Sequence, residues 1–377
     1  MSRRVCINGR FLSQRRTGVQ RYALETLFAL DELVARDSAA LGWDFEVLAP
    51  PDAEQPALRR IAFQRVGRLK GNAWEQLSLP LAARGAFLLS FGPTGPLLKR
   101  DQAVTIHDAA VHAVPQAFSF AFRTWYKLLL PVLAQRSPFV MTVSEFSKAE
   151  VVRHFAANAA LTRVSGEGWQ HLLRITPDPS ILSRRGLTQG RYLLSVSSLT
   201  PHKNFGLVAE AARLLKNTDI QLVVAGGMDA RVFGHIDPAT LSALKCVGYV
   251  SDAELRALYE NAAAFVFPSL YEGFGIPPLE AMASGCPVLA ARAGAIPEVC
   301  GDAAWYFDPR DANALAKLVR AITQDEAARQ DLRERGRRRI AQHSWEHAAR
   351  EHLAALADAL ETTSVAARQP NPLGRAA

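Results

Sequence analysis

A glycine-containing segment between an expected strand and an expected helix carries the residues best suited to chemistry. It runs from Pro268 to Met282, with Gly273 and Gly275 in the loop and Pro277 at a position suited to the first helical turn. Glycines let a backbone approach a ligand closely, and the free N–H groups at a helix N-terminus attract anions. The segment therefore predicts a site for an anionic group.

Two glutamates accompany this loop. Glu272 lies in the loop itself, and Glu280 follows about one turn into the expected helix. Carboxylates spaced in this way can accept hydrogen bonds from different hydroxyls of one polyol ligand. The same pattern also suits a strand–turn–helix unit with two surface glutamates, and the glycine loop alone favours that interpretation.

A histidine follows another expected strand. His107 comes directly after the apolar run Ala103–Ile106 and precedes Asp108, so it lies at the carboxyl end of a strand. Open sheets of parallel strands bind ligands at this end. A histidine there is either a buried structural residue or a site residue, and its position alone does not decide between the two.

The composition bounds the class of protein. The chain has 377 residues, of which 49% are hydrophobic and 21% charged, and this usage excludes whole-chain disorder, a collagen repeat and a coiled coil. No apolar run approaches the ~20 residues of a spanning helix, and the N-terminus lacks the apolar stretch of a secretory signal. The 4 cysteines are far apart and form no C-x-x-C pair, which argues against a zinc site and suits a reducing cytosol.

The charge balance favours an anionic partner. The formal net charge is +8, which suits contact with phosphate or a lipid head-group surface, although a solvated basic surface explains it equally well. Neither zinc-finger spacing nor an RNP-type aromatic run supports nucleic acid as a partner. Basic residues at 59–70, with Trp74, and aromatic residues at 118–126 could form a face for an anionic lipid surface. A packed aromatic helix beside a solvated charged segment is the alternative, and the residues alone favour it.

Short apolar runs alternate with helical patterns in two series. This alternation predicts an α/β protein with two Rossmann-like doubly wound domains, at 1–180 and 185–343, facing each other across a cleft. The stretch 166–189 is expected to be an irregular interdomain linker. A last helix is expected over 344–361, from where it can cross back to the first domain. The tail 362–377 is expected to be disordered.

In this context, the segment from Glu272 to Glu280 resembles the signature of the GT4 family of retaining glycosyltransferases, which have the two-domain GT-B fold. The resemblance covers nearly the whole chain and is strongest from 190 to 310. Its motifs are Thr17–Tyr22, Thr105–Asp108, Thr142–Ser147, Ser195–Asn204 (similar to the family's diphosphate loop), Val247–Leu255, Glu280–Val288 and Pro297–Val299.

The resemblance implies a role for each matching residue. Glu280 would bind the ribose hydroxyls of a nucleotide sugar, and Lys203 would neutralise its diphosphate. Glu272 would contact the transferred sugar near its reacting carbon, with His107 on the donor-sugar and acceptor side; with Lys203, these two are the implied catalytic residues. The other implied donor-binding residues are Gly18, Ser198, His202, Tyr249, Val250, Gly273, Phe274, Gly275 and Ile276.

One position departs from the family pattern. Many members carry an arginine just before the lysine, or a Gly-Arg pair six residues upstream, where this chain has His202 and Ser197. We expect His202 to be only partly protonated at pH 7, with Arg21 or Arg16 compensating from the other domain. Because no D-x-D triplet occurs, we expect no metal and no cofactor, only a GDP- or UDP-linked nucleotide-sugar co-substrate.

The resemblance implies transfer of a hexose, with GDP-mannose as the first choice of donor, to a glycan or lipid-linked glycan in cell-surface polysaccharide or lipopolysaccharide assembly. The implied location is the cytoplasm or the inner face of the membrane, with peripheral membrane contact. The departing phosphate oxygen can accept the acceptor's proton, while a double displacement through Glu272 stays open. A sugar-nucleotide epimerase or phosphorylase on the same fold, or a non-catalytic degenerate relative, are the alternatives.

Overall fold

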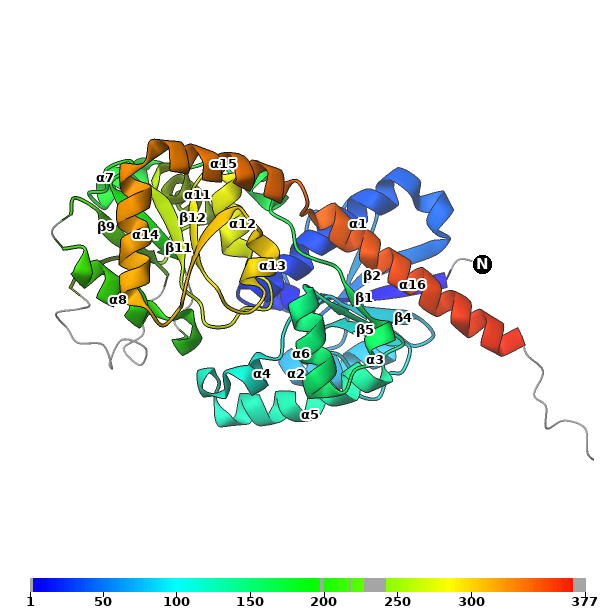
Figure 1. Cartoon of the computed structure of the whole chain (residues 1–377). Coiled ribbons are helices and arrows are strands. Elements are labelled where there is room, and N and C mark those ends of the chain that lie inside the picture. Colours follow the sequence, from blue (N-terminus) through cyan, green and yellow to red (C-terminus); the bar gives the residue numbers. More distant parts are fainter. Residues whose placement is uncertain (1–2, 197–199, 217, 227–241, 369–377) are drawn as a thin grey trace, which may run out of the picture.

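Two α/β units lie side by side, each built around one parallel sheet (Figure 1). The computed structural model describes residues 3–196, 200–216, 218–226 and 242–368. Within these ranges, no helix has the apolar length that crossing a membrane requires. The predicted architecture of two parallel-sheet α/β units is confirmed.

The first sheet has seven strands in the order β3-β2-β1-β4-β5-β6-β7. All residues of β4, β5 and β6 are buried, as expected for a sheet covered on both faces. The two edge strands, β3 and β7, were not predicted, and β3 in particular is largely exposed and polar. The strands are β1 (Arg3–Asn8), β2 (Trp43–Ala49), β3 (Ala62–Arg65), β4 (Phe87–Ser90), β5 (Gln102–Thr105), β6 (Val140–Thr142) and β7 (Thr162–Val164).

Polar caps begin two of the helices that cover this sheet. Thr17 and Gln20 form a capping box at the start of α1. Ser144 caps the start of α6, because its hydroxyl accepts a hydrogen bond from the Ser147 N–H at 2.9 Å. The helices are α1 (Gly18–Leu41), α2 (Gly71–Ala73), α3 (Leu79–Ala82), α4 (Ala110–Ala113), α5 (Phe120–Arg136) and α6 (Glu145–Phe155).

The second sheet has six strands in the order β10-β9-β8-β11-β12-β13. Its order reverses beside β8, so the carboxyl ends of β8 and β11 lie next to each other. In doubly wound sheets this switch point is where ligands bind. The strands are β8 (Tyr192–Val196), β9 (Gln221–Ala225), β10 (Leu244–Gly248), β11 (Ala264–Phe267), β12 (Val288–Ala291) and β13 (Ala304–Phe307).

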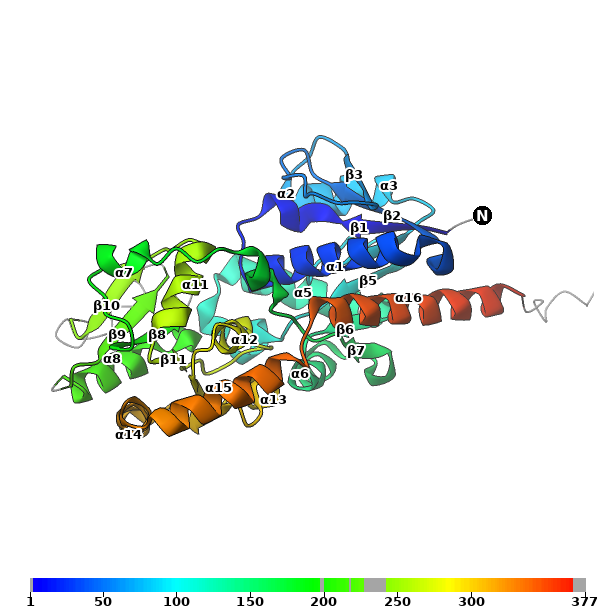
Figure 2. The same cartoon turned by 90° about the horizontal axis from the view of Figure 1, so that it is seen from above.

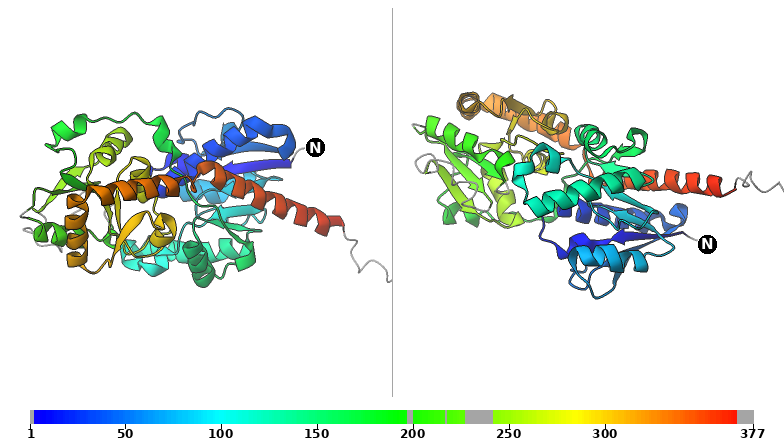
Figure 3. Two further views of the ribbon diagram at one scale, coloured as in Figure 1. Left: turned by 45° about the horizontal axis from the view of Figure 1, so that its top comes forward. Right: turned by 90° about the horizontal axis from the view of Figure 1, so that it is seen from below.

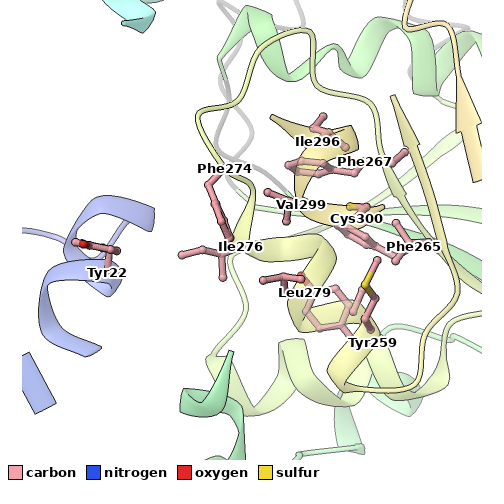
Figure 4. Packing of buried hydrophobic residues seen from close by; sticks show 14 of the residues in the cluster. Tyr22, Tyr259, Phe265, Phe267, Phe274, Ile276, Leu279, Ile296, Val299 and Cys300 are labelled. Carbon is pink, nitrogen blue, oxygen red and sulfur yellow. The ribbon is translucent and has the colours of Figure 1, made fainter. Parts of the chain in front are cut away.

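The core of the second unit packs helices against β11. Figure 4 shows Phe265 of β11 beside Leu279 of α12 and Val299 of α13, and all three side chains are buried. This packing fixes where α12 begins. The helices of this unit are α7 (Ser180–Arg184), α8 (Phe205–Leu214), α11 (Asp252–Asn261), α12 (Ile276–Ala283), α13 (Ile296–Cys300), α14 (Ala312–Gln324) and α15 (Glu326–Ile340).

The last helix, α16 (Trp345–Arg368), returns to the first unit and lies along α1 (Figures 2 and 3). The Tyr22 hydroxyl of α1 lies 2.8 Å from Nε2 of His352 in α16. The sequence predicted disorder over 362–377. Since α16 continues to Arg368, this prediction is wrong for 362–368, and 369–377 lie outside the described residues.

The stretch 166–189 is more regular than the sequence predicted. It contains a 3-10 helix at Gln170–Arg174 and the short α7. Both follow the crossing from the first unit to the second. This regular stretch places His171 against Glu280 of α12.

Candidate active site

The loop between β11 and α12 lies where the two units touch. Gly275 has φ of 104°, a conformation that favours glycine, and it directly precedes α12. The Gly273 carbonyl accepts hydrogen bonds from the Ser144 hydroxyl at 2.5 Å and the Ser147 hydroxyl at 2.8 Å. A Cβ on Gly273 would lie 2.4 Å from the His107 carbonyl oxygen. Of the two glycines, one is needed for the backbone angle and the other for the approach of the first unit.

A lysine and a glutamate from neighbouring loops form an ion pair at this point. Lys203 Nζ lies 2.6 Å from Glu272 Oε1, and their side chains are only 18% and 13% exposed. The two loops are joined by a backbone hydrogen bond from the Leu270 N–H to the His202 carbonyl at 2.8 Å. One positive and one negative group are thereby held beside the N-terminus of α12.

His202 carries no charge in this site at neutral pH. Burial first, and then the charge of Lys203, lower the pKa of His202 to about 4. The expectation that His202 would be partly protonated at pH 7 is therefore wrong. Among the described residues of this loop, Lys203 supplies the positive charge.

Basic residues from the first unit also reach the second. Arg21 Nη2 lies 2.9 Å from Asp252 Oδ1 in α11, and the Arg15 guanidinium lies 4.4 Å from the centre of the Tyr249 ring. Arg15 and Arg16 both line the cleft between the units. Arg21 is paired with a carboxylate, so Arg15 and Arg16 are the better placed of the three to meet an anion.

Glu280 lies one turn deeper, behind the cleft wall. It is 6% exposed, and its Oε1 lies 2.8 Å from His171 Nε2 while its Oε2 accepts from the Tyr259 hydroxyl at 3.2 Å. The indole N–H of Trp345 donates to His171 Nδ1 at 3.3 Å, so the Nε2 proton of a neutral His171 points at Glu280. Burial alone would raise the pKa of Glu280, but the His171 hydrogen bond and the charge of Arg21 hold it below its usual value.

His107 faces the same cleft from the first unit. Its Nε2–H points at the Phe91 carbonyl at 3.3 Å, and its Nδ1 lies 3.6 Å from Glu167 Oε1. Burial raises the pKa of Glu167, against the opposing effect of His107, and burial likewise raises the pKa of Asp108. Two carboxyl groups with raised pKa values, Glu167 and Asp108, therefore lie near the position where Glu272 meets the first unit.

Two hollows meet at these residues. One has a volume of about 540 Å³ and is lined by the loops of the second unit together with the start of α1. The other has a volume of about 700 Å³ and is lined mainly by the first unit. Seven residues line both hollows: Arg15, Thr17, Val19, His107, Asp108, Lys203 and Glu272. They mark the boundary at which two ligands would be in contact.

The structure brings most of the predicted donor-binding residues to the smaller hollow. Glu280 is not among its lining residues, and Ser198 lies outside the described residues together with Ser197. His202 lines only the larger hollow. The predicted donor-binding residues on the wall of the smaller hollow are Gly18, Lys203, Tyr249, Val250, Glu272, Gly273, Phe274, Gly275 and Ile276, and the implied catalytic residue His107 lies there with them.

Some residues of the site were missed in the sequence. Glu167 and His171 lie in the stretch interpreted as an irregular linker, and Arg15 precedes the Thr17–Tyr22 motif. Gly166 and Gly168 on either side of Glu167 were the local signal, because glycines flanking a charged residue suit a close approach. By contrast, Trp74 of the expected lipid-facing group is fully buried, which removes it from any outer face.

Comparison with known proteins adds independent findings. Residues 183–339 match the family model described as glycosyl transferases group 1. The O-antigen chain mannosyltransferase B of Escherichia coli is 29% identical over 253 residues, which cover 64% of this chain and 66% of that protein, just under two thirds. The O-antigen chain mannosyltransferase RfbU of Salmonella typhimurium is 27% identical over 329 residues, covering 83% of this chain and 89% of that protein.

A solved structure extends the likeness to the whole fold. The sucrose-phosphate synthase from Thermosynechococcus elongatus superimposes with a TM-score of 0.72 at 21% identity, covering 97% of this chain and 100% of that one. At this identity the likeness concerns the fold, and it includes both units and their arrangement across the cleft.

Proposed function

We propose that the chain is a group 1 glycosyl transferase, the family whose model residues 183–339 match, and that it transfers mannose from GDP-mannose, with retention of configuration, to a glycan acceptor. The acceptor would be an intermediate of cell-surface polysaccharide or lipopolysaccharide assembly. Glycosyltransferase activity, the donor, the stereochemistry and the acceptor are all parts of the proposal, and the family match supports the first of them.

One observation carries the proposal: Lys203 and Glu272 form an ion pair beside the N-terminus of α12, in a hollow that both units line. A nucleoside diphosphate gains negative charge as its bond to the sugar breaks. Pro277 and Pro278 in the first turn of α12 have no N–H, so the Ile276 N–H, the loop N–H groups of Phe274 and Gly275, and the Lys203 ammonium would stabilise this charge. The same hollow offers the Tyr249 ring and the Val250 backbone to the base.

The names of the relatives support mannose and polysaccharide assembly. Both relatives described above are O-antigen chain mannosyltransferases. Their matches extend over more than half of this chain, so they include parts of both units. This supports the same class of sugar and of pathway for this chain, although the identity is below 30% in each case.

The arrangement of acidic groups suits transfer on one face of the sugar. The leaving phosphate oxygen would accept the proton of the attacking hydroxyl, and Glu272 would stabilise the positive charge that develops on the sugar ring. His107, held by Phe91 and Glu167, would orient the reacting hydroxyls. The pairing of Glu272 with Lys203 lowers its strength as a nucleophile, which favours this path over a double displacement through Glu272.

Ribose binding by Glu280 is compatible with its present partners. Each of its oxygens accepts one hydrogen bond, from His171 and from Tyr259. A carboxylate oxygen has a second lone pair, so a ribose hydroxyl could be added if α12 or α11 shifts slightly on donor binding. We propose that His171 positions Glu280 for this contact.

We further propose that the reaction needs no metal or other cofactor, because Lys203 and the α12 N-terminus would balance the diphosphate charge. Activity in excess EDTA should then equal activity with added Mg²⁺.

Peripheral contact with the inner membrane face also stays a proposal, supported by the exposed Phe120 (75%) beside basic residues of α5. Flotation with anionic vesicles would test it.

The central experiment is a thermal-shift screen against GDP-, UDP- and dTDP-sugars, followed by NMR of the products. GDP-mannose should raise the melting temperature and be slowly hydrolysed, since a ligand that binds the folded state stabilises it. With an acceptor present, the product should be an α-mannoside. If no nucleotide sugar binds or turns over, the proposed function is wrong, and conversion of the donor without any acceptor would indicate an epimerase.

A further inference from the structure

The last helix, α16, carries a buried histidine close to the site. His352 is 2% exposed and lies about two turns after the helix begins. Burial first, and then the charge of His107, lower the pKa of His352 to about 3, so its ring is neutral at pH 7. His352 lines neither hollow. The proposed transfer reaction by itself therefore gives this histidine no role.

His352 anchors a tyrosine of α1 through a hydrogen bond. Its Nε2 lies 2.8 Å from the Tyr22 hydroxyl, which in turn lies 2.8 Å from the Ser165 hydroxyl. The Ser165 hydroxyl donates its one proton to the Thr142 carbonyl at 3.1 Å, so it accepts from Tyr22. Tyr22 then accepts from His352, which assigns the His352 proton to Nε2. The Nδ1 atom has no hydrogen-bond partner among the described residues.

The anchored tyrosine packs against His107. Tyr22 is fully buried, and its ring lies 4.7 Å from the His107 ring at an interplanar angle of 88°. The polar contacts of His107 are longer than usual, at 3.3 Å to the Phe91 carbonyl and 3.6 Å to Glu167, against about 2.9 Å for a typical N–H···O bond. These contacts restrain the imidazole without fixing the tilt of its plane. The edge-to-face contact with Tyr22 fixes that tilt.

His352 also contacts a second neighbour of His107. Its ring lies 4.8 Å from the Phe91 ring at an interplanar angle of 76°, and Phe91 is fully buried. The carbonyl of Phe91 is the acceptor that His107 Nε2 faces. Tyr22 and Phe91 therefore each contact both histidines. A change at His352 reaches His107 through two packed side chains that have little room to move.

We propose that His352 is a positioning residue for His107: through Tyr22 and Phe91 it sets the orientation in which His107 faces the reacting sugar. This inference rests on the proposed function, because it concerns the geometry of one group of that site. It gives α16 a part in the reaction in addition to its packing along α1. The alternative is that His352 merely fills space beneath α16, and the test separates the two.

The test compares two substitutions of the same residue. His352→Leu keeps an apolar side chain of similar size but removes the hydrogen bond, whereas the amide nitrogen of His352→Gln can take the place of Nε2. Tyr22→Phe removes the hydroxyl and keeps the ring. His347→Ala is the matched control, because its side chain is 57% exposed on the same helix and lines neither hollow. Chemical denaturation of the full chain establishes that each variant is folded.

Two readouts follow on the folded variants. The first is hydrolysis of GDP-mannose together with its Kd, and the second is the ring NMR signal of His107 in ¹³C-histidine-labelled chain, assigned by its loss in His107→Gln. In His352→Leu and Tyr22→Phe, kcat should fall about tenfold with an unchanged Kd, because a misoriented group slows the reaction while the donor contacts stay. The His107 signal should shift in both.

The remaining variants test the hydrogen bond itself. His352→Gln should restore most of kcat and of the His107 signal, and His347→Ala should change neither. The double variant His352→Leu/Tyr22→Phe should lose no more kcat than either single variant, because both changes break one interaction. If His352→Leu does not fold, Tyr22→Phe decides in the same way, since it keeps the packing.

A loss of stability with an unchanged kcat and an unmoved His107 signal would show that His352 only fills space, and this would overturn the proposal. Equal losses of kcat in His352→Leu and His352→Gln would overturn it as well, because the hydrogen bond would then have no part. If the unaltered chain neither binds nor hydrolyses GDP-mannose, the proposed function is wrong. The His107 signal would still decide whether His352 positions that ring.

Discussion

Lys203 Nζ lies 2.6 Å from Glu272 Oε1 in a site where His202, the residue next to the lysine, is neutral at pH 7. Under the proposed function, the Lys203 ammonium would both hold the carboxylate beside the sugar and face the diphosphate. The negative charge of a bound donor would then compete with Glu272 for Lys203. The strength of donor binding would depend in part on how this cation is shared.

Replacing Lys203 with methionine should remove that charge with little change in volume. We expect kcat with GDP-mannose to fall by roughly 10²–10³, the usual cost of losing one group that stabilises developing charge. The Kd for GDP should rise in isothermal titration. Lys317→Met is the control, since Lys317 is exposed on α14 and lines neither hollow. Unchanged kcat and Kd in Lys203→Met would contradict the assigned role.

Replacing His171 with alanine should destabilise the fold through Glu280. The buried carboxylate would lose its 2.8 Å hydrogen-bond partner, and leaving a buried polar group without its partner costs about 1–3 kcal/mol, with the upper end expected for a charged group. Chemical denaturation should show this loss. In the double variant with Glu280→Gln the loss should shrink, because an uncharged amide is cheaper to bury. His347→Ala, at an exposed position of α16, should have almost no effect. Equal losses in the single and double variants would show that the pair is not the cause.

The same pair makes a prediction about pH. The pKa of Glu280 is lower in the folded chain than in the unfolded chain, so its contribution to stability is present above the ordinary glutamate pKa and is lost as the pH falls through the lowered value. His171→Ala should therefore flatten the decline in the free energy of unfolding below about pH 4.5. A decline of the same steepness in the variant would argue against the linkage.

His202 gives a second pH effect in a different window. Its folded pKa of about 4 lies below the ordinary value of 6.5, so the unfolded chain takes up the proton first and stability falls as the pH drops from 6.5 to 4. His202→Asn should reduce this slope by up to about 1.4 kcal/mol per pH unit. His343 and His352, whose pKa values are also lowered, contribute to the same window in both proteins, so the difference between the two curves is the measurement. Coincident curves would exclude the effect.

The sequence predicted the loop well, because its chemistry is local. Gly273, Gly275 and Pro277 have conformational requirements that a short segment reveals, and the family resemblance gave Lys203 its implied place. The partners of Glu280 could not be predicted in this way. His171 and Trp345 reach it from segments 109 and 65 residues away in the chain, and neither belongs to a local motif. The edge strands β3 and β7 were missed for a similar reason, since their pairing depends on neighbours in the folded sheet rather than on their own apolar pattern.

The state of His202 also depended on the fold. A histidine in a loop sequence gives no sign of burial, and its usual pKa suggested partial charge. In the structure, burial and the adjacent Lys203 together keep it neutral. Charge near a functional site is thus set by depth and by neighbours, which a residue type alone does not specify.

Replacing Gly273 with alanine should separate the two units. The added Cβ would lie 2.4 Å from the His107 carbonyl and 2.9 Å from the Asp108 Cβ, and backbone atoms cannot move aside without shifting a whole strand end. The loop would instead retreat and weaken the bonds from Ser144 and Ser147 to its carbonyl. We expect kcat to fall by about 10²-fold, because His107 and Glu272 would no longer face each other closely. Small-angle scattering should show a larger radius of gyration, with an unchanged circular dichroism spectrum. Gly92→Ala is the control for the scattering, since a Cβ there meets no heavy atom within 4 Å. If Gly273→Ala kept both its compactness and its kcat, the close approach of the units at this loop would not be what holds the two hollows together.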